Sequence, residues 1–255
     1  MIDLLLGGSP CQGFSFAGKQ LNFSDPRSKL FFDFVKALEV LKPKYFLLEN
    51  VKMKKEYEDV ITQHLGVEPI EINSALVSAQ NRKRLYWTNI PNVFQPTDRN
   101  IFWSDVQINN AKDVYYVTEK MMNWINKSTK RKNKFKIYEN TSKEKMQMLE
   151  ASHYKGISNQ RCFAIKDNNL LRYIHPVECE RLQTLPDNYT AIGIFDGKEK
   201  PISNTQRYKM LGNGWTVDVI AHILSFIPET YLHTVVSLFD GISCGQVALE
   251  RAGKV

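Results

Sequence analysis

One thiol stands where the chain can present it to a reaction partner. The apolar residues 2–6 predict a short buried strand, and a Gly-Gly pair then leads into Pro10 and Cys11. The glycines let the backbone turn sharply, and the proline stiffens the turn. In open α/β sheets, ligands bind at the carboxyl ends of strands. We therefore expect Cys11 to act as a nucleophile rather than as a small buried apolar side chain.

A carboxyl group ends the next predicted strand. Residues 45–48 form a second apolar run, which leads directly into Glu49, Asn50 and Val51. A thiolate adds readily to an electron-poor carbon such as C6 of a pyrimidine, provided that an acid near the ring nitrogen lets the ring accept the electrons. We expect Glu49 to lie beside Cys11 at the same sheet edge, where its carboxyl group can donate a proton to N3 of a cytosine or share one with it.

The elements that position these residues alternate between strand and helix, which indicates an α/β fold. Strands are predicted at 2–6, 45–48, 67–77 and 85–90, and helices at 30–41 and 56–65. Residues 92–170 are polar, basic and weakly periodic, which favours a second, smaller domain. Helical patterns return at 175–182 and 217–227, and a strand at 235–239 precedes a glycine-containing turn and the start of a helix.

Composition limits the class of protein. The 255 residues carry a net charge of +7, and 43% of them are hydrophobic, as in an ordinary globular protein with one or two domains. No apolar run is long enough for a membrane span, and no signal peptide is present, so we expect a cytoplasmic protein without a membrane partner. The four cysteines are widely spaced, which suggests neither a disulfide framework nor a metal site.

Positive charge is concentrated in one region. Residues 120–155 contain ten Lys and Arg against three acidic residues, with aromatic side chains between them. Such a segment is either a solvated basic loop or a surface that neutralises phosphates, and the interleaved aromatics favour a nucleic-acid partner.

Six motifs together make the chain resemble the DNA cytosine-5 methyltransferases. The resemblance covers nearly the whole chain outside residues 90–160. The matching segments are Pro10-Cys11, Glu49-Asn50-Val51, Gln80-Asn81-Arg82-Lys83-Arg84, the stretch from Arg172 to Asp187, Gly212-Asn213-Gly214-Trp215, and the turn from Phe239 to Gly245. The resemblance implies a Rossmann-like sheet that uses S-adenosyl-L-methionine, double-stranded DNA as the partner, and a place in DNA methylation and restriction-modification.

The resemblance also assigns roles to residues. It implies that Cys11 adds to C6 of a flipped cytosine, that Glu49 engages N3 and the exocyclic amine, and that Arg84, with Arg82, holds the base and a neighbouring phosphate. It implies no metal. The residues that it assigns to the cofactor are Pro10, Asn213, Trp215, Phe239, Asp240, Gly241, Ile242, Ser243 and Gly245.

The motif order departs from the family. The cofactor turn usually comes first, whereas here it lies at 235–245, which suggests a circular permutation. Two edge strands that would bear acidic residues for the cofactor's ribose and adenine are not found, and their absence should leave the strand at 235–239 on a sheet edge. The chain is then half of a split enzyme that needs a second polypeptide, an enzyme with weak cofactor affinity, or a DNA-binding protein without catalysis.

We accordingly expect three regions. Residues 1–90 hold the catalytic part, residues 91–172 recognise the target, and residues 173–255 return to the methyltransferase domain. The same chemistry on RNA is an alternative, since the catalytic residues do not separate the two nucleic acids.

Overall fold

The computed structural model describes residues 2–9, 30–112 and 114–255. They form two compact units. The first comprises Met1–Ser74, Lys83–Pro96 and Val217–Val255, and the second comprises Ala75–Arg82 and Thr97–Thr216. The units therefore divide the chain differently from the three expected regions, since residues 173–216 pack within the second unit. The functional assignment of the three regions stays a prediction.

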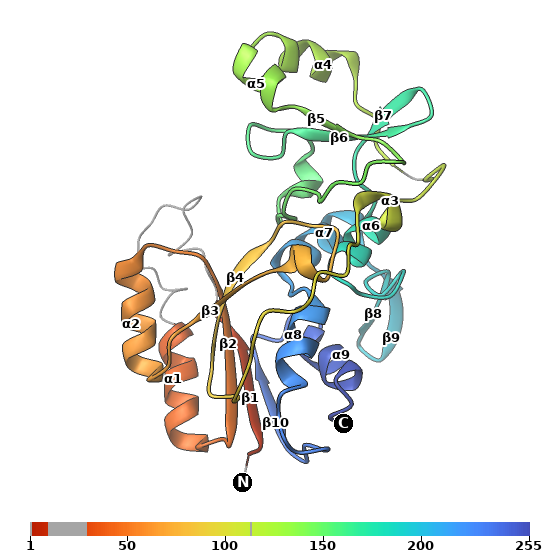
Figure 1. Ribbon diagram of the computed structural model, residues 1–255. Coiled ribbons are helices and arrows are strands. Elements are labelled where there is room, and N and C mark those ends of the chain that lie inside the picture. Colours follow the sequence, from red (N-terminus) through yellow and green to blue (C-terminus); the bar gives the residue numbers. More distant parts are fainter. Residues whose placement is uncertain (1, 10–29, 113) are drawn as a thin grey trace. The chain divides into compact units, whose positions relative to one another are not determined.

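The first unit is built on a mixed five-stranded sheet with strand order β10-β1-β2-β4-β3 (Figure 1). Strands β10, β1 and β2 run parallel, whereas β4 is antiparallel to both of its neighbours. The strands are β1 (Leu4–Gly8), β2 (Tyr45–Val51), β3 (Ile70–Asn73), β4 (Lys83–Thr88) and β10 (Val235–Leu238). The expected α/β class is confirmed, and β10 lies on a sheet edge as expected.

Helices cover both faces of this sheet. On one face, α1 (Leu30–Leu41) and α2 (Lys55–Leu65) bury Phe31, Phe34 and Ile61 against the side chains of alternate strand residues, among them Leu5 and Leu48. The other face carries α8 (Val217–Leu224) and α9 (Cys244–Arg251), which pack against each other (Figure 1). Because both faces are covered, β1 and β2 read as continuous apolar runs rather than as alternating ones.

Two glycines allow close packing around β1. A Cβ on Gly7 would lie 2.6 Å from the ring of Phe34, and a Cβ on Gly245 would lie 3.1 Å from the Leu6 side chain. The missing side chains therefore let α1 and α9 approach the strand from its two faces.

The second unit contains a three-stranded sheet, a separate hairpin and several short helices. The sheet order is β5-β6-β7, and β8 pairs with β9. The elements are α3 (Trp103–Val106), α4 (Glu119–Asn126), α5 (Thr129–Lys134), β5 (Lys136–Tyr138), a 3₁₀ turn η3 (His153–Lys155), β6 (Phe163–Asp167), β7 (Leu170–Arg172), α6 (Pro176–Leu182), β8 (Ile192–Phe195), β9 (Lys198–Pro201) and α7 (Asn204–Asn213). A further 3₁₀ turn, η2 (Ser74–Leu76), spans the point in the sequence at which the first unit's residues end and the second unit's begin.

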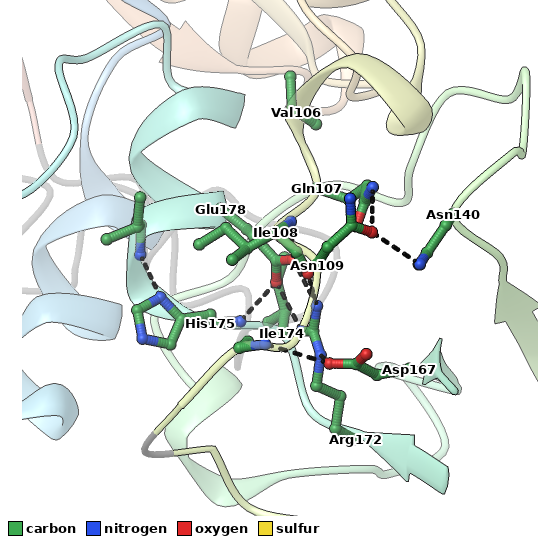
Figure 2. A network of polar contacts seen from close by, with 12 residues as sticks. Val106, Gln107, Ile108, Asn109, Asn140, Asp167, Arg172, Ile174, His175 and Glu178 are labelled. Atoms are coloured by element: carbon green, nitrogen blue, oxygen red, sulfur yellow. Dashed lines mark hydrogen bonds and ion pairs between the residues drawn. The ribbon is translucent and has the colours of Figure 1, made fainter. Parts of the chain in front are cut away.

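A buried charged network holds the centre of the second unit (Figure 2). The Arg172 guanidinium is fully buried and donates to Asp167 at 3.1 Å and to both carboxylate oxygens of Glu178 at 2.7 and 2.8 Å. The Glu178 carboxylate also accepts the backbone N–H of Ile108 at 2.9 Å, and Asp167 accepts that of Ala111 at 3.2 Å. Charged side chains thus fix irregular backbone that neither a helix nor a sheet supports.

Most predicted elements of the first unit are confirmed. Helix α1 matches its prediction at both ends, and α2, β2 and β10 differ from theirs by at most three residues at either end. The strand predicted at 67–77 is shorter, because residues after β3 turn into η2. Among the described residues, no helix has the length and apolar character needed to cross a bilayer.

Candidate active site

The carboxyl ends of the three parallel strands β10, β1 and β2 lie side by side along one edge of the first unit's sheet, at the ends of the strands. Gly8 at the end of β1 is in register with Glu49 of β2, and on the other side Gly7 is in register with Leu238 of β10. The sequence directly after β1 is the predicted thiol turn, and the sequence directly after β10 is the predicted cofactor turn. The backbone thus brings the starting points of both turns and Glu49 to one place.

Glu49 is paired with Arg84 within this edge. The Arg84 Nε lies 3.0 Å from Glu49 Oε1, and the two side chains are 9% and 11% exposed, respectively. Arg84 comes from β4, where its backbone is in register with Val51 of β2. The ion pair orients the carboxyl group, and a group so shielded from water interacts strongly with any ring placed against it.

Asn50 anchors the last described residue before the thiol turn. Its Nδ2 donates to Ser9 Oγ at 3.0 Å, and its Oδ1 accepts the N–H of Val51 at 2.8 Å. Ser9 is buried. The chain therefore leaves β1 from a fixed point beside Glu49. Pro10 and Cys11 lie outside the described residues, so the positions predicted for them stay predictions.

The turn after β10 has an unusual backbone. Phe239, Gly241 and Ser243 have positive φ values of 60°, 62° and 56°. For two residues that carry a Cβ this conformation is strained, and such strain gathers at functional sites. Asp240 stabilises the turn, because its carboxylate accepts hydrogen bonds from Ser237 Oγ at 2.7 Å and Ser243 Oγ at 2.6 Å.

This turn fits a nucleoside cofactor such as S-adenosylmethionine. Gly241 presents no Cβ to an incoming group, and the Phe239 ring is 38% exposed at the strand end, where it can lie against an adenine. Ser243 is the N-cap of α9, so the N–H groups of this helix's first turn follow directly after the cofactor turn. The described residues include no group of three or more His, Cys, Asp or Glu side chains arranged to hold a metal ion.

Three of the predicted site residues fall in the second unit. Arg82 is only 2% exposed, and its guanidinium donates to the carbonyl oxygens of Leu149, Gly212 and Gly214 at 3.1, 3.3 and 2.8 Å. Through these hydrogen bonds Arg82 holds the backbone at Leu149 and the segment from Gly212 to Gly214 together. Its predicted contact with the flipped base therefore gains no support, whereas Arg84 lies beside Glu49.

Asn213 and Trp215 belong to the segment that Arg82 ties down. Asn213 is the exposed last residue of α7, and Trp215 is buried. Gln183 fixes the same segment, since its Nε2 donates to the Leu211 carbonyl at 2.6 Å and its Oε1 accepts from Thr216 Oγ1 at 2.9 Å. The predicted roles of Asn213 and Trp215 toward the cofactor stay predictions.

Sequence reasoning missed the supporting residues. The motifs contain Asn50, Gln80 and Gln183 but assign them no role, although all three are buried amides. Gln80 Nε2 donates to Gln183 Oε1 at 2.9 Å. Each of these amides has a polar neighbour in the sequence, so no local signal marks it as buried and hydrogen-bonded.

Comparison with known proteins supports the same reading. The family model of the C-5 cytosine-specific DNA methylases matches residues 1–229. The type II methyltransferase M1.ScrFI of Lactococcus lactis subsp. cremoris is 32% identical over 249 residues, which cover 86% of this chain and 60% of that protein.

Two further relatives have the same kind of name. M.NlaX of Neisseria lactamica and M.HhaI of Haemophilus parahaemolyticus, both type II methyltransferases, are each 28% identical over 87% of this chain and 74% of their own length. The chain thus spans between three-fifths and three-quarters of these relatives. Because the family model covers most of the sequence, the expected family is confirmed, and the chain belongs to the C-5 cytosine-specific DNA methylases.

Proposed function

We propose that this protein transfers a methyl group from S-adenosylmethionine to C5 of cytosine in duplex DNA. The observation that carries the proposal is that the carboxyl ends of β10, β1 and β2 lie side by side. The strand that leads into the thiol turn, β1, lies between the strand that leads into the cofactor turn and the strand that carries Glu49, which pairs with Arg84. The names of the relatives agree with this reaction class. A soluble, cytoplasmic setting fits DNA as the substrate.

The reaction begins at Cys11. Its thiolate bonds to C6 of a cytosine that has left the base stack, because the ring cannot be reached inside the duplex. The electrons move toward N3, where the Glu49 carboxyl group supplies or shares the proton. C5 becomes enamine-like and takes the methyl group that S-adenosylmethionine supplies. Loss of the C5 proton then expels the Cys11 thiolate and leaves 5-methylcytosine.

Arg84 has two tasks in this scheme. It orients Glu49 through the 3.0 Å contact, and it keeps a positive charge next to the position that the base would occupy. A guanidinium at this place also attracts the phosphate beside a flipped nucleotide.

Covalent trapping tests the central step. Duplex DNA containing 5-fluorocytosine blocks the loss of the group at C5, so the enzyme should remain attached through Cys11 in the presence of cofactor. We expect an adduct that survives denaturing electrophoresis and that disappears in Cys11→Ser. Cys162→Ala removes a buried thiol of the second unit and should keep the adduct. An adduct that persists in Cys11→Ser would contradict the assignment.

Glu49→Gln is expected to slow methyl transfer by about 10²- to 10⁴-fold, the usual contribution of a positioned acid or base. The variant keeps the size of the side chain, so DNA binding should change little. Glu39→Gln on the exposed side of α1 is the matched control and should retain full activity. Incorporation of tritiated methyl groups into DNA and into RNA, compared in parallel, measures both variants and identifies the nucleic acid.

In an alternative form of the proposal, the enzyme is active only together with a second polypeptide. Within the described residues, β10 has a paired neighbour on one side only, and its outer edge offers unpaired backbone groups to another strand. Chromatography of the chain alone and after co-expression with its neighbouring reading frames separates an active monomer from a complex.

A further inference from the structure

A loop of the second unit, residues 150–161, has its two ends clamped together; we call it the clamped loop. Arg161, which is 8% exposed, donates from Nη1 to Glu150 at 3.0 Å and also to Ser152 Oγ. Its Nε reaches the carbonyl oxygen of Gly156 at 3.2 Å. The Nδ1 of buried His153 accepts the N–H of Glu150 at 2.8 Å. The base of the loop is therefore fixed before any ligand arrives.

Residues 156–160 of the clamped loop, which we call its tip, are ordered by the backbone conformation of Gly156 and by the Ser158 hydroxyl group. Gly156 has φ 72° and ψ −156°, a conformation that only glycine adopts without strain, and a Cβ there would lie 3.0 Å from the Tyr173 ring. Ser158 Oγ accepts the N–H groups of Gln160 and Arg161, each at 3.2 Å. The turn holds its residues in one arrangement.

Two amide side chains belong to this tip. Asn159 and Gln160 are both exposed. Neither amide side chain has a hydrogen-bond partner within residues 2–9, 30–112 and 114–255. Asn109 differs, because its exposed amide already accepts hydrogen bonds from Gln107 at 3.0 Å and from Asn140 at 2.8 Å. The amide groups of Asn159 and Gln160 are thus attached to an ordered turn, and within the described residues their donors and acceptors remain available.

Lysines surround the same loop. The ammonium groups of Lys155 and Lys209 lie 5.7 and 5.4 Å from the centre of the Tyr154 ring, which is 39% exposed. Lys134, at the end of α5, donates to the backbone carbonyl of Asn159. The carboxylate of the loop, Glu150, is already engaged by Arg161. This combination of ammonium groups and an exposed aromatic ring complements a phosphate backbone.

We propose that the clamped loop reads base edges of the recognition sequence in duplex DNA, with Asn159 and Gln160 as the specificity-determining residues. Amide side chains pair in a bidentate manner with N6 and N7 of adenine in the major groove. The recognition sequence therefore contains an A·T pair at the position that this tip contacts. Lys134, Lys155 and Lys209 hold the neighbouring phosphates. The inference rests on the proposed function, since it takes DNA as the substrate.

Selection of bound sequences from a random duplex library tests this inference without requiring methyl transfer. The full chain is used with S-adenosylmethionine present. The unchanged protein should enrich a sequence with an A·T pair, and Asn159→Ala or Gln160→Ala should lower that preference by roughly 5- to 150-fold, the usual value of one bidentate contact. Asn169→Ala removes an exposed amide in the turn between β6 and β7 and should leave the profile unchanged.

Two further variants separate reading from folding. Gln160→Glu offers acceptors only, and it should move the preference from adenine toward cytosine, an effect that a misfolded chain cannot produce. Lys155→Ala should weaken binding to all sequences alike and reduce the salt dependence by about one phosphate contact.

Two results would overturn the inference: enrichment of no sequence by the unchanged protein, or the same profile in Asn159→Ala, Gln160→Ala and the unchanged protein. The proposed function fails on different evidence, namely the absence of 5-methylcytosine in the product. A chain that selects sequences through the clamped loop but transfers no methyl group keeps the inference and loses the proposed function.

Discussion

Replacement of Arg172 by methionine removes the cation at the centre of the second unit. Asp167 and Glu178 would then be left as buried carboxylates without their partner, since Arg172 and Glu178 are both fully buried in the structure. Breaking a buried pair in this way costs about 3–5 kcal/mol in the free energy of unfolding. The N–H of Ile108 would keep its acceptor, but its carbonyl oxygen would lose the Arg172 donor at 2.9 Å.

Hydrogen exchange measured by mass spectrometry is the suitable assay, because the chain has two compact units and a single unfolding midpoint would mix them. A loss of 3–5 kcal/mol corresponds to about 150- to 5,000-fold faster exchange of the best-protected amides in β6, β7 and α6. Peptides from β1 and β2 serve as the internal control. The double variant Arg172→Met/Glu178→Gln also removes one of the two buried carboxylates that lack a partner. It should recover about 1–3 kcal/mol of the lost free energy of unfolding.

A change below about fivefold in these amides, roughly 1 kcal/mol, would refute the reasoning. It would mean that water or a shift of the backbone solvates the two carboxylates once Arg172 is gone. Strict additivity of the two substitutions would refute it as well, because residues that share one network must couple.

Two other substitutions test packing and pH dependence. Gly212→Ala would place a Cβ in the backbone of Ala151, so we expect a loss of at least 1–3 kcal/mol and a melting temperature lower by several degrees, whereas Gly197→Ala, whose Cβ meets open space, should cost only the strain of its positive φ, about 1 kcal/mol. Burial lowers the pKa of His153 below its usual 6.5, so below that pH the unfolded chain binds a proton that the folded chain excludes, and stability falls as the pH drops. Between pH 7.5 and 5.5 the melting temperature should decrease less in His153→Gln than in the unchanged protein. The exposed control His233→Gln should show the same decrease as the unchanged protein. Equal decreases in His153→Gln and the unchanged protein would contradict this account.

The first unit could be predicted well because its signals are local. Apolar runs and helical periodicity identify β1, β2 and α1 within the sequence itself, and the alternation of strand and helix predicts which strand ends share an edge. The register of Gly8 with Glu49 confirms that part of the reasoning.

The second unit could not be predicted in the same way. Nothing in the local sequence distinguishes Arg172 from a solvated arginine. Its burial depends on ion pairs with Asp167 and Glu178, five and six residues away, and on a hydrogen bond to the carbonyl oxygen of Ile108, 64 residues away. Arg82 and Arg84 stand two residues apart in one charged run, yet one bonds backbone carbonyls and the other pairs with Glu49. Such differences depend on contacts between residues far apart in sequence, which periodicity does not contain.

The parallel pairing of β1 with β10 also constrains how the molecule assembles. Asp3 accepts the N–H of Thr234 across 231 positions of sequence, and the two strands begin their ladder there. During synthesis, at about 5–20 residues per second, β1 would wait tens of seconds for this neighbour. Until then, one side of the first strand stays open to chaperones and to wrong partners. The turn that follows β10 therefore takes its place beside the end of β1 only after both strands have been synthesised and paired.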